Sequence, residues 1–247
     1  MKISSLEKCL TVLDLLGKSP GGKRLRDIAQ ELGLSPSTVH HMLATLLPHN
    51  YVMQDRETKK YSLGLKLVEL GHSALENFDV RQPAARHLRR LSEATGSAAH
   101  LAVFRGGKVV YIDMVGAPSG LALVSYVGFG TEPHAAAGGK VLLADLPEAD
   151  IKALYPTGRL KQYGKNTLKT VKQLLDQLAL VREQGHALDD EEYYEGVRCV
   201  AAPVTRNGAT VAAISVTGSV FTMTLERIDR EIIGLVMGAA KATSDEL

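Results

Sequence analysis

The sequence contains no tryptophan, and its aromatic side chains are limited to eight tyrosines and four phenylalanines. A hydrophobic core must therefore be built mainly from Leu, Val, Ile and Ala, within a hydrophobic fraction of 45% over 247 residues. This composition excludes disordered, collagen-like and low-complexity chains. The length suits either one large domain or two small ones.

Cysteine is nearly absent as well, because the chain has only Cys9 and Cys199, which lie 190 residues apart. That spacing excludes a disulfide framework and a closely spaced thiolate metal site, and it fits a reducing cytoplasm. No apolar run approaches the length that a membrane helix needs. The first apolar stretch is interrupted by Asp14 and lacks the cleavage pattern of a signal peptide. We therefore expect a cytoplasmic location and no membrane partner.

Net charge is also small, because 29 Lys and Arg residues face 27 Asp and Glu residues, for +2. The excess lies in residues 1–75, which hold 10 basic and 7 acidic side chains, for +3. A slightly basic N-terminal third and a nearly neutral remainder indicate two different roles. The arrangement of these charges carries more information than their sum.

Residues 1–64 predict three helices followed by a β-hairpin. Ser4 and Glu7 have the spacing of a capping box for the first helix. Gly33 ends a second, short helix, and Ser35 caps a third helix that has proline at its first position. Two short helices joined in this way have the spacing of a helix-turn-helix.

The third helix and the hairpin carry side chains that suit DNA. Short hydroxyls and imidazoles near the start of a recognition helix reach phosphates and base edges. The hairpin turn at 55–60 would be a basic wing that holds phosphates. The expected DNA contacts are Arg26, Ser35, Ser37, Thr38, His40, His41, Thr45, Arg56, Lys59 and Lys60. The alternative is a three-helix protein-interaction module with a solvated run of charge.

Residues 65–78 predict a linker helix with an apolar stripe that includes Leu65, Val68 and Leu70. DNA-binding modules of this size usually act in pairs, so we expect this region to serve dimerisation. The alternative is that its apolar face only covers its own domain.

Residues 79–247 predict an α+β domain with one antiparallel sheet. Glycines divide two apolar runs in a hairpin at 98–115, and a tight-turn signal divides two more at 198–218. A further strand is expected at 121–127, and helices are expected to be capped by Asp79 and Thr224. The predicted fold class is therefore mixed: a winged helix-turn-helix, a linker helix and an α+β domain.

Small side chains and hydroxyls of this domain could line a ligand pocket. Ala137 and Gly138 start a predicted helix, where free N–H groups bind anions such as carboxylates. Ser215 and Thr217 share one face of a strand, and buried hydroxyls need partners. One alternative is that the small residues only allow the start of the helix to pack tightly. Another is that the neighbouring backbone supplies the hydrogen-bond partners of the two hydroxyls. Taken alone, Cys199 is typical of a small buried hydrophobe, and the carboxylates at 189–192 indicate a solvated loop.

The chain resembles the IclR family of transcriptional regulators from about Ser4 to Thr243. In the N-terminal part the resemblance rests on LRDIAQELGLSPSTVHHMLATL, NYV and YSLGLKLVELG. In the C-terminal part it rests on PHAAAGGKVLLADL, VAAISVTGS and DDEEYYEGVRCVAAPV, and the last of these is the most specific. One departure is His41, which stands where the family often has Arg. It leaves the operator sequence open.

The resemblance implies that residues 79–247 form a GAF-like effector domain that binds a small metabolite, for which we expect an organic acid. It also implies a homodimer or tetramer that represses or activates transcription from a palindromic or pseudo-palindromic operator in double-stranded DNA. The implied effector contacts are Ala137, Gly138, Asp189, Cys199, Ser215 and Thr217, with Leu121 and Leu123 as candidates for the apolar wall.

Isolated residues are also compatible with an enzyme or a metal protein. His134, Asp189 and Cys199 have the chemistry of a base, an acid and a nucleophile, or of zinc ligands. Nothing in their spacing brings them together, so we expect no catalytic residue, no metal and no cofactor. The remaining alternative is a small-molecule-binding or enzymatic domain with only non-specific affinity for DNA.

Overall fold

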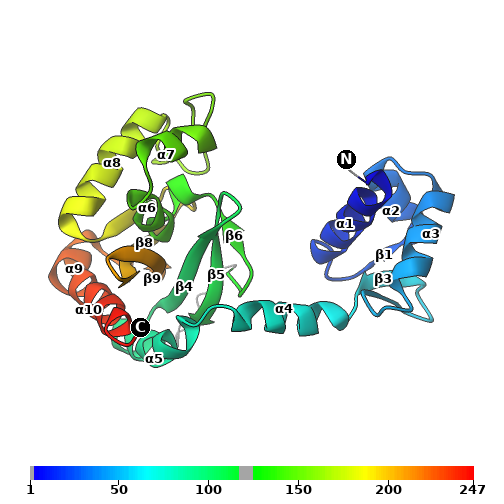
Figure 1. Cartoon of the computed structure of the whole chain (residues 1–247), viewed down its shortest axis with the longest axis horizontal. Coiled ribbons are helices and arrows are strands. Elements are labelled where there is room, and N and C mark those ends of the chain that lie inside the picture. Colours follow the sequence, from blue (N-terminus) through cyan, green and yellow to red (C-terminus); the bar gives the residue numbers. More distant parts are fainter. Residues whose placement is uncertain (1–2, 117–124) are drawn as a thin grey trace. The chain divides into compact units, whose positions relative to one another are not determined.

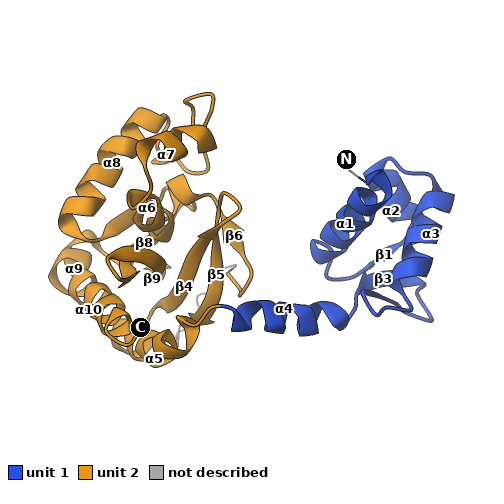
Figure 2. Ribbon diagram, viewed as in Figure 1, with its two compact units in different colours: residues 1–77 blue, residues 78–247 orange. Residues whose placement is uncertain are grey.

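The computed structural model in Figure 1 describes residues 3–116 and 125–247. It divides into two compact units, residues 1–77 and 78–247, which are coloured separately in Figure 2. Each unit has its own hydrophobic core. The expected strand at 121–127 falls partly outside the described residues, and residues 125–127 are not in a strand.

The first unit is a three-helix core with a small antiparallel sheet and a further helix. Val12, Ile28, Val39 and Leu43 are among the side chains that fill this core. The strand order in the sheet is β1-β3-β2. The elements are α1 (Ser4–Gly17), β1 (Lys23–Arg24), α2 (Leu25–Leu32), α3 (Pro36–Leu46), β2 (Val52–Gln54), β3 (Lys60–Leu63) and α4 (Lys66–Glu76).

Local sequence signals explain the ends of these helices, with one exception. Gly33 follows α2 with a φ of 63°, a left-handed conformation that favours glycine. The Ser35 hydroxyl accepts a hydrogen bond from the Thr38 N–H at 3.2 Å and so caps α3. The prediction of a capping box at Ser4 is wrong, because α1 has Ile3 at its cap position and no side-chain cap. The strand β1 was not expected.

The second unit is built on one sheet, in which the strand order is β6-β5-β4-β9-β8-β7 and neighbouring strands are antiparallel. The predicted mixed fold with an antiparallel sheet is therefore confirmed. The strands are β4 (Ala98–Arg105), β5 (Lys108–Val115), β6 (Gly130–Thr131), β7 (Ala187–Asp190), β8 (Val197–Arg206) and β9 (Ala209–Ser219).

Helices cover the two faces of this sheet (Figure 1). α5 and α10 pack on one face, against β4 and β8. α6 and α8 pack on the other face, where Ala102, Ala201 and Ala213 leave room for them. The bounds are α5 (Arg81–Thr95), α6 (Ala137–Ala144), α7 (Glu148–Leu154), α8 (Val171–Gln184), α9 (Leu225–Arg227) and α10 (Ile233–Ser244), with a 3-10 turn at Pro133–Ala135 and a π-helical turn at Ile228–Ile232.

Two predictions about this unit need correction. Asp79 does not cap α5, which has Val80 at its cap position; the Asp79 carboxylate instead pairs with Arg206 at 2.8 Å. The acidic run does not begin in a solvated loop, because Asp189 lies in β7 and is buried. By contrast, Thr224 caps the last helical segment as expected, accepting a hydrogen bond from the Arg227 N–H.

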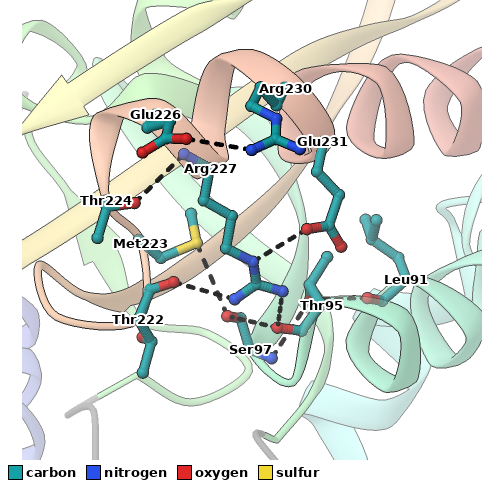
Figure 3. A network of polar contacts seen from close by, with 10 residues as sticks. All are labelled: Leu91, Thr95, Ser97, Thr222, Met223, Thr224, Glu226, Arg227, Arg230 and Glu231. Atoms are coloured by element: carbon teal, nitrogen blue, oxygen red, sulfur yellow. Dashed lines mark hydrogen bonds and ion pairs between the residues drawn. The ribbon is translucent and has the colours of Figure 1, made fainter.

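The Arg227 side chain ties the start of this segment to the end of α5 (Figure 3). Its guanidinium donates to the carbonyl oxygens of Thr95 and Thr222 at 3.0 and 2.9 Å. It also pairs with the Glu231 carboxylate at 3.1 Å. Hydrogen bonds from a charged donor are stronger than neutral ones, so this network fixes the turn after β9 against α5.

Replacing Arg227 with methionine removes these donors and keeps most of the aliphatic length. We expect Arg227→Met to lower the free energy of unfolding by about 1–3 kcal/mol, because the carbonyl oxygen of the buried Thr95 loses a charged partner. Urea denaturation followed by circular dichroism measures the change. The matched control is Arg230→Met, because Arg230 makes an exposed i,i+4 pair with Glu226, which is worth at most about 0.5 kcal/mol. Equal effects of the two substitutions would contradict the anchoring role of Arg227.

Candidate DNA-binding surface and ligand cavity

The N-terminal residues predicted to contact DNA lie on one helix and one hairpin of the first unit. On α3 and at its cap, Ser35, Ser37, His40, His41 and Thr45 are exposed. Thr38 is half-buried, and its hydroxyl lies 2.8 Å from that of Ser35. The helix therefore offers hydroxyls and imidazoles to solvent on the side opposite its buried Val39 and Leu43.

The hairpin turn between β2 and β3 is shaped by the Asp55 carboxylate. One of its oxygens accepts hydrogen bonds from the Thr58 N–H at 2.6 Å, the Glu57 N–H at 3.1 Å and the Thr58 hydroxyl at 2.8 Å. These bonds lower the pKa of Asp55, the largest contribution coming from the Thr58 N–H. The predicted phosphate contacts Arg56, Lys59 and Lys60 are all exposed on this turn, and Arg26 is exposed on α2.

A cavity opens on the α6 side of the sheet in the second unit. Its cavity volume is about 50 Å³. The residues that line it come from all the strands of the sheet and the adjoining loops: His100, Tyr111, Ser125, Phe129, Thr131, Ala136, Asp189, Tyr193, Tyr194, Val197, Cys199 and Thr217. Most of its wall is aromatic or apolar, with a small number of polar groups, as is usual for ligand sites.

Strand register brings three of the predicted effector contacts together. Asp189 of β7 pairs with Cys199 of β8, and Cys199 pairs with Thr217 of β9. Directly paired residues point to the same face of a sheet, and these three residues line the same cavity. The Thr217 hydroxyl donates a hydrogen bond to the Cys199 sulfur at 3.3 Å.

A buried ion pair forms the framework next to Asp189. The Lys140 ammonium of α6 donates to the Glu192 carboxylate at 2.5 Å and also to the carbonyl oxygen of Leu188. The Glu192 N–H donates to the Asp189 carboxylate at 2.8 Å. Lys140, Asp189 and Glu192 are all buried. Glu192 is paired with Lys140 and does not line the cavity, so Asp189 is the acidic group that faces it.

The environment of these groups sets their protonation. Burial, together with the nearby Glu192 carboxylate, raises the pKa of Asp189 to about 7. Burial, together with Asp189, raises the pKa of the Cys199 thiol to about 12, so this sulfur stays protonated near neutral pH. A nucleophilic cysteine needs the thiolate form. The arrangement of Cys199 therefore suits binding and not nucleophilic attack.

Other predicted effector residues lie beside the cavity or outside the described part of the chain. Ala137 and Gly138 start α6 as predicted, but Ala136 is the residue that lines the cavity there. Gly138 packs closely against Ala102 and Ala213 of the sheet. Ser215 is buried and pairs with His100 of β4. Leu121 and Leu123 fall outside the described residues.

The structure also adds residues that the sequence did not single out. His100 and Tyr111 line the cavity with their rings stacked at a centroid distance of 4.7 Å. Thr131 of β6 lines it too and is buried. The available signal was a histidine in the apolar strand AAHLAVF. A lone buried histidine is hard to assign from sequence, because its strand partners are unknown.

The enzyme and metal alternatives gain no support from the site. His134 does not line the cavity, and its Nε2 atom lies 2.8 Å from the carbonyl oxygen of Lys161. In the described part of the chain, no group of three or more His, Cys, Asp or Glu side chains is placed to hold a metal ion. Within the same residues, no helix is long and apolar enough to cross a membrane.

The raised pKa of Asp189 makes stability depend on pH with a definite sign. The folded state binds more protons than the unfolded state between the ordinary carboxyl pKa and about 7. The free energy of unfolding therefore falls as pH rises through that interval. Asp189→Asn removes the titration and keeps the oxygen that accepts from Glu192. We expect the stability of this variant relative to wild type to increase from pH 5 to pH 8, by at most about 1.4 kcal/mol per pH unit.

Urea denaturation at the two pH values measures this difference. Asp190→Asn is the control, because Asp190 pairs with Arg198 at 2.6 Å and is less buried. It should lower stability at both pH values. A stability difference for Asp189→Asn that does not change between pH 5 and pH 8 would show that Asp189 titrates as an ordinary carboxyl group.

Comparison with known proteins places both units in one family. A model of the IclR helix-turn-helix domain matches residues 5–56, and a model described as bacterial transcriptional regulator IclR C-terminal matches residues 72–245. The HTH-type transcriptional regulator XynR of Escherichia coli K12 is 41% identical over 211 residues, which cover 85% of this chain and 84% of that protein.

Solved structures show the same architecture. The crystal structure of the Thermotoga maritima IclR matches with a TM-score of 0.81 at 31% identity, covering 100% of this chain and 99% of that one. An IclR homologue from Microbacterium hydrocarbonoxydans, solved in complex with 4-hydroxybenzoate, matches with a TM-score of 0.83 at 20% identity, covering 98% of each chain. The match to the IclR C-terminal family model alone covers more than half of the sequence. The chain therefore belongs to the IclR family of bacterial transcriptional regulators.

Proposed function

We propose that this regulator binds a specific DNA sequence and that a small organic acid in the cavity of the second unit sets its affinity for DNA. The main support for this proposal is the cavity, because DNA binding by the first unit does not require a cavity with polar side chains in the second unit. We assign DNA binding to residues 1–64, linkage and dimerisation to residues 65–78, and effector binding to residues 79–247.

Three observations support an acid as the effector. The cavity includes Ala136 at the N-terminal cap of α6, where the helix dipole favours negative charge. Asp189, whose pKa lies near 7, can be protonated when an acid binds beside it. The homologue from Microbacterium hydrocarbonoxydans holds 4-hydroxybenzoate, an aromatic acid. We assign the direct contacts to Asp189, Cys199 and Thr217, with Ser215, Ala137, Gly138, Leu121 and Leu123 as the remaining candidates.

The acid acts by favouring one arrangement of the DNA-binding units over another. It shifts DNA affinity only by the difference between its own affinities for the two arrangements, typically about 1–3 kcal/mol. The same mechanism serves a repressor or an activator. The rival function, an enzyme with non-specific DNA affinity, is less well supported, because burial keeps Cys199 a protonated thiol and nucleophilic attack needs the thiolate.

The exposed apolar face of α4 supports a homodimer. No residue of α4 is buried, and Leu65 and Val68 are 73% and 67% exposed at its N-terminal end. Leu6 and Leu10 of α1 are exposed as well. Apolar side chains in groups of this kind mark protein interaction sites. A second copy of the chain is the partner that a palindromic operator requires.

Polar substitution on α4 tests this dimer. We expect Leu65→Ser with Val68→Ser to raise the dimer dissociation constant at least about tenfold, because each subunit loses roughly 1 kcal/mol or more of apolar burial. Light scattering across a range of protein concentrations measures the mass. Leu225→Ser, the same type of substitution at an exposed leucine of α9, is the control. An unchanged dimer in the double variant would place the interface elsewhere.

The wing is tested by the salt dependence of DNA binding. Duplexes selected from a random library supply the probe, and enrichment of a palindrome is itself the expected result. Arg56→Ala and Lys60→Ala should weaken binding to all sequences alike and reduce the slope of log affinity against log salt by about 0.9 each. Lys152→Ala on α7 is the control, because Lys152 pairs with Glu148 in the second unit. Unchanged slopes would remove the wing from the DNA interface, and failure to enrich any site would favour non-specific affinity.

A further inference from the structure

The cavity has two polar ends, and the predicted effector contacts account for only one of them. Asp189, Cys199 and Thr217 lie on β7, β8 and β9, at one side of the sheet. Thr131 lies on β6, the edge strand at the opposite side, and His100 lies on the central strand β4. All of these residues line the same cavity. The lining of the cavity therefore extends across the sheet.

At the second end, two buried polar atoms have no partner. The Nε2 atom of His100 lies 3.0 Å from the Ser125 hydroxyl, whereas its Nδ1 atom has no hydrogen bond within the described residues. The Thr131 hydroxyl also has no hydrogen-bond partner within the described residues. His100 is 1% exposed and Thr131 is 4% exposed. Buried polar groups in native proteins almost always have partners, so these atoms point to a polar ligand group.

The His100 ring is neutral, which defines what it can recognise. Burial lowers its pKa to about 4. The charged and titratable side chains that line the cavity with it are Asp189, Cys199 and the tyrosines at 111, 193 and 194, and none is a cation. A neutral imidazole offers one N–H and one lone pair. Ser125 uses one of these, and the other is left for a ligand hydroxyl or carboxyl oxygen.

We propose that His100 is a specificity-determining residue: together with Thr131 it hydrogen-bonds a second polar group on the effector, in the part of the cavity between β4 and β6 and away from Asp189. The effector is then an acid that carries a second polar group, such as a hydroxy acid. It is not an acid whose only polar group is one carboxyl. This inference rests on the proposed function of the cavity as an organic-acid site.

Matched pairs of acids test the proposal on the full-length protein. Isothermal titration calorimetry compares 4-hydroxybenzoate with benzoate, 4-hydroxybutyrate with butyrate, and succinate with butyrate. We expect wild type to bind the bifunctional member of at least one pair about tenfold or more tightly than its partner. His100→Phe keeps a ring that stacks on Tyr111 and removes both nitrogens, so it should reduce that preference to about threefold or less.

Thr131→Val provides a second variant of nearly unchanged shape, with circular dichroism as the check of folding for both. Thr131→Val should reduce the same preference, and it keeps the proposal testable if His100→Phe does not fold. Thr243→Val is the matched control, because Thr243 is buried in α10 and its hydroxyl donates to the Ala239 carbonyl. It should retain the wild-type preference.

Each outcome bears on one of the two claims. Wild-type protein that binds both members of every pair equally tightly overturns the inference about His100. So does a preference that survives in both His100→Phe and Thr131→Val. Wild-type protein that binds none of these acids overturns the organic-acid effector itself, and the inference about His100 falls with it.

Discussion

The buried ion pair between Lys140 and Glu192 is the constraint on which the ligand cavity depends. Two charges removed from water are costly unless they are paired. Lys140 pairs with Glu192 and also donates to the Leu188 carbonyl, so α6 is held to both ends of the Asp189 segment. That arrangement keeps the Asp189 carboxyl buried, and the Glu192 carboxylate contributes to its raised pKa. The chemistry of the cavity therefore follows from a lysine that does not itself line it.

The cavity also adjoins the network that fixes the end of α5. Thr217 lines the cavity, and the next residue, Gly218, has no space for a side chain because Met223 and Ser97 lie against it. Ser97 and Thr95 belong to the same group of contacts as Arg227 (Figure 3). A ligand that moves β9 at Thr217 must therefore move this group as well, since a packed interior transmits displacement. The same helix α5 follows α4 in the chain, so this group of contacts lies where the second unit joins the first in sequence.

The sequence predicts local features better than buried polar ones. The cap at Ser35, the left-handed glycine at Gly33 and the hairpins of the sheet depend on neighbouring residues, and the structure contains them. The acidic run was misassigned because its burial depends on Lys140, which is some 50 residues away in sequence. His100 gave no signal for the same reason: its role depends on β5 and β6, and register between distant strands is not encoded locally. The family resemblance supplied Asp189 and Cys199 but not the residues at the second end.

A sensor has to release its ligand, and the composition of the cavity suits that requirement. Among the described residues that line it there is no lysine or arginine, so the proposed acid would be held by neutral donors, aromatic walls and the start of α6. Hydrogen bonds between neutral groups contribute about 0.5–1.5 kcal/mol each. A few of them give reversible binding and still discriminate among acids of similar shape, because each unmatched buried group costs more than each bond gains. A fixed cation would bind many acids tightly and discriminate among them poorly, whereas in the proposed site His100 and Thr131 would make recognition depend on where the second polar group lies.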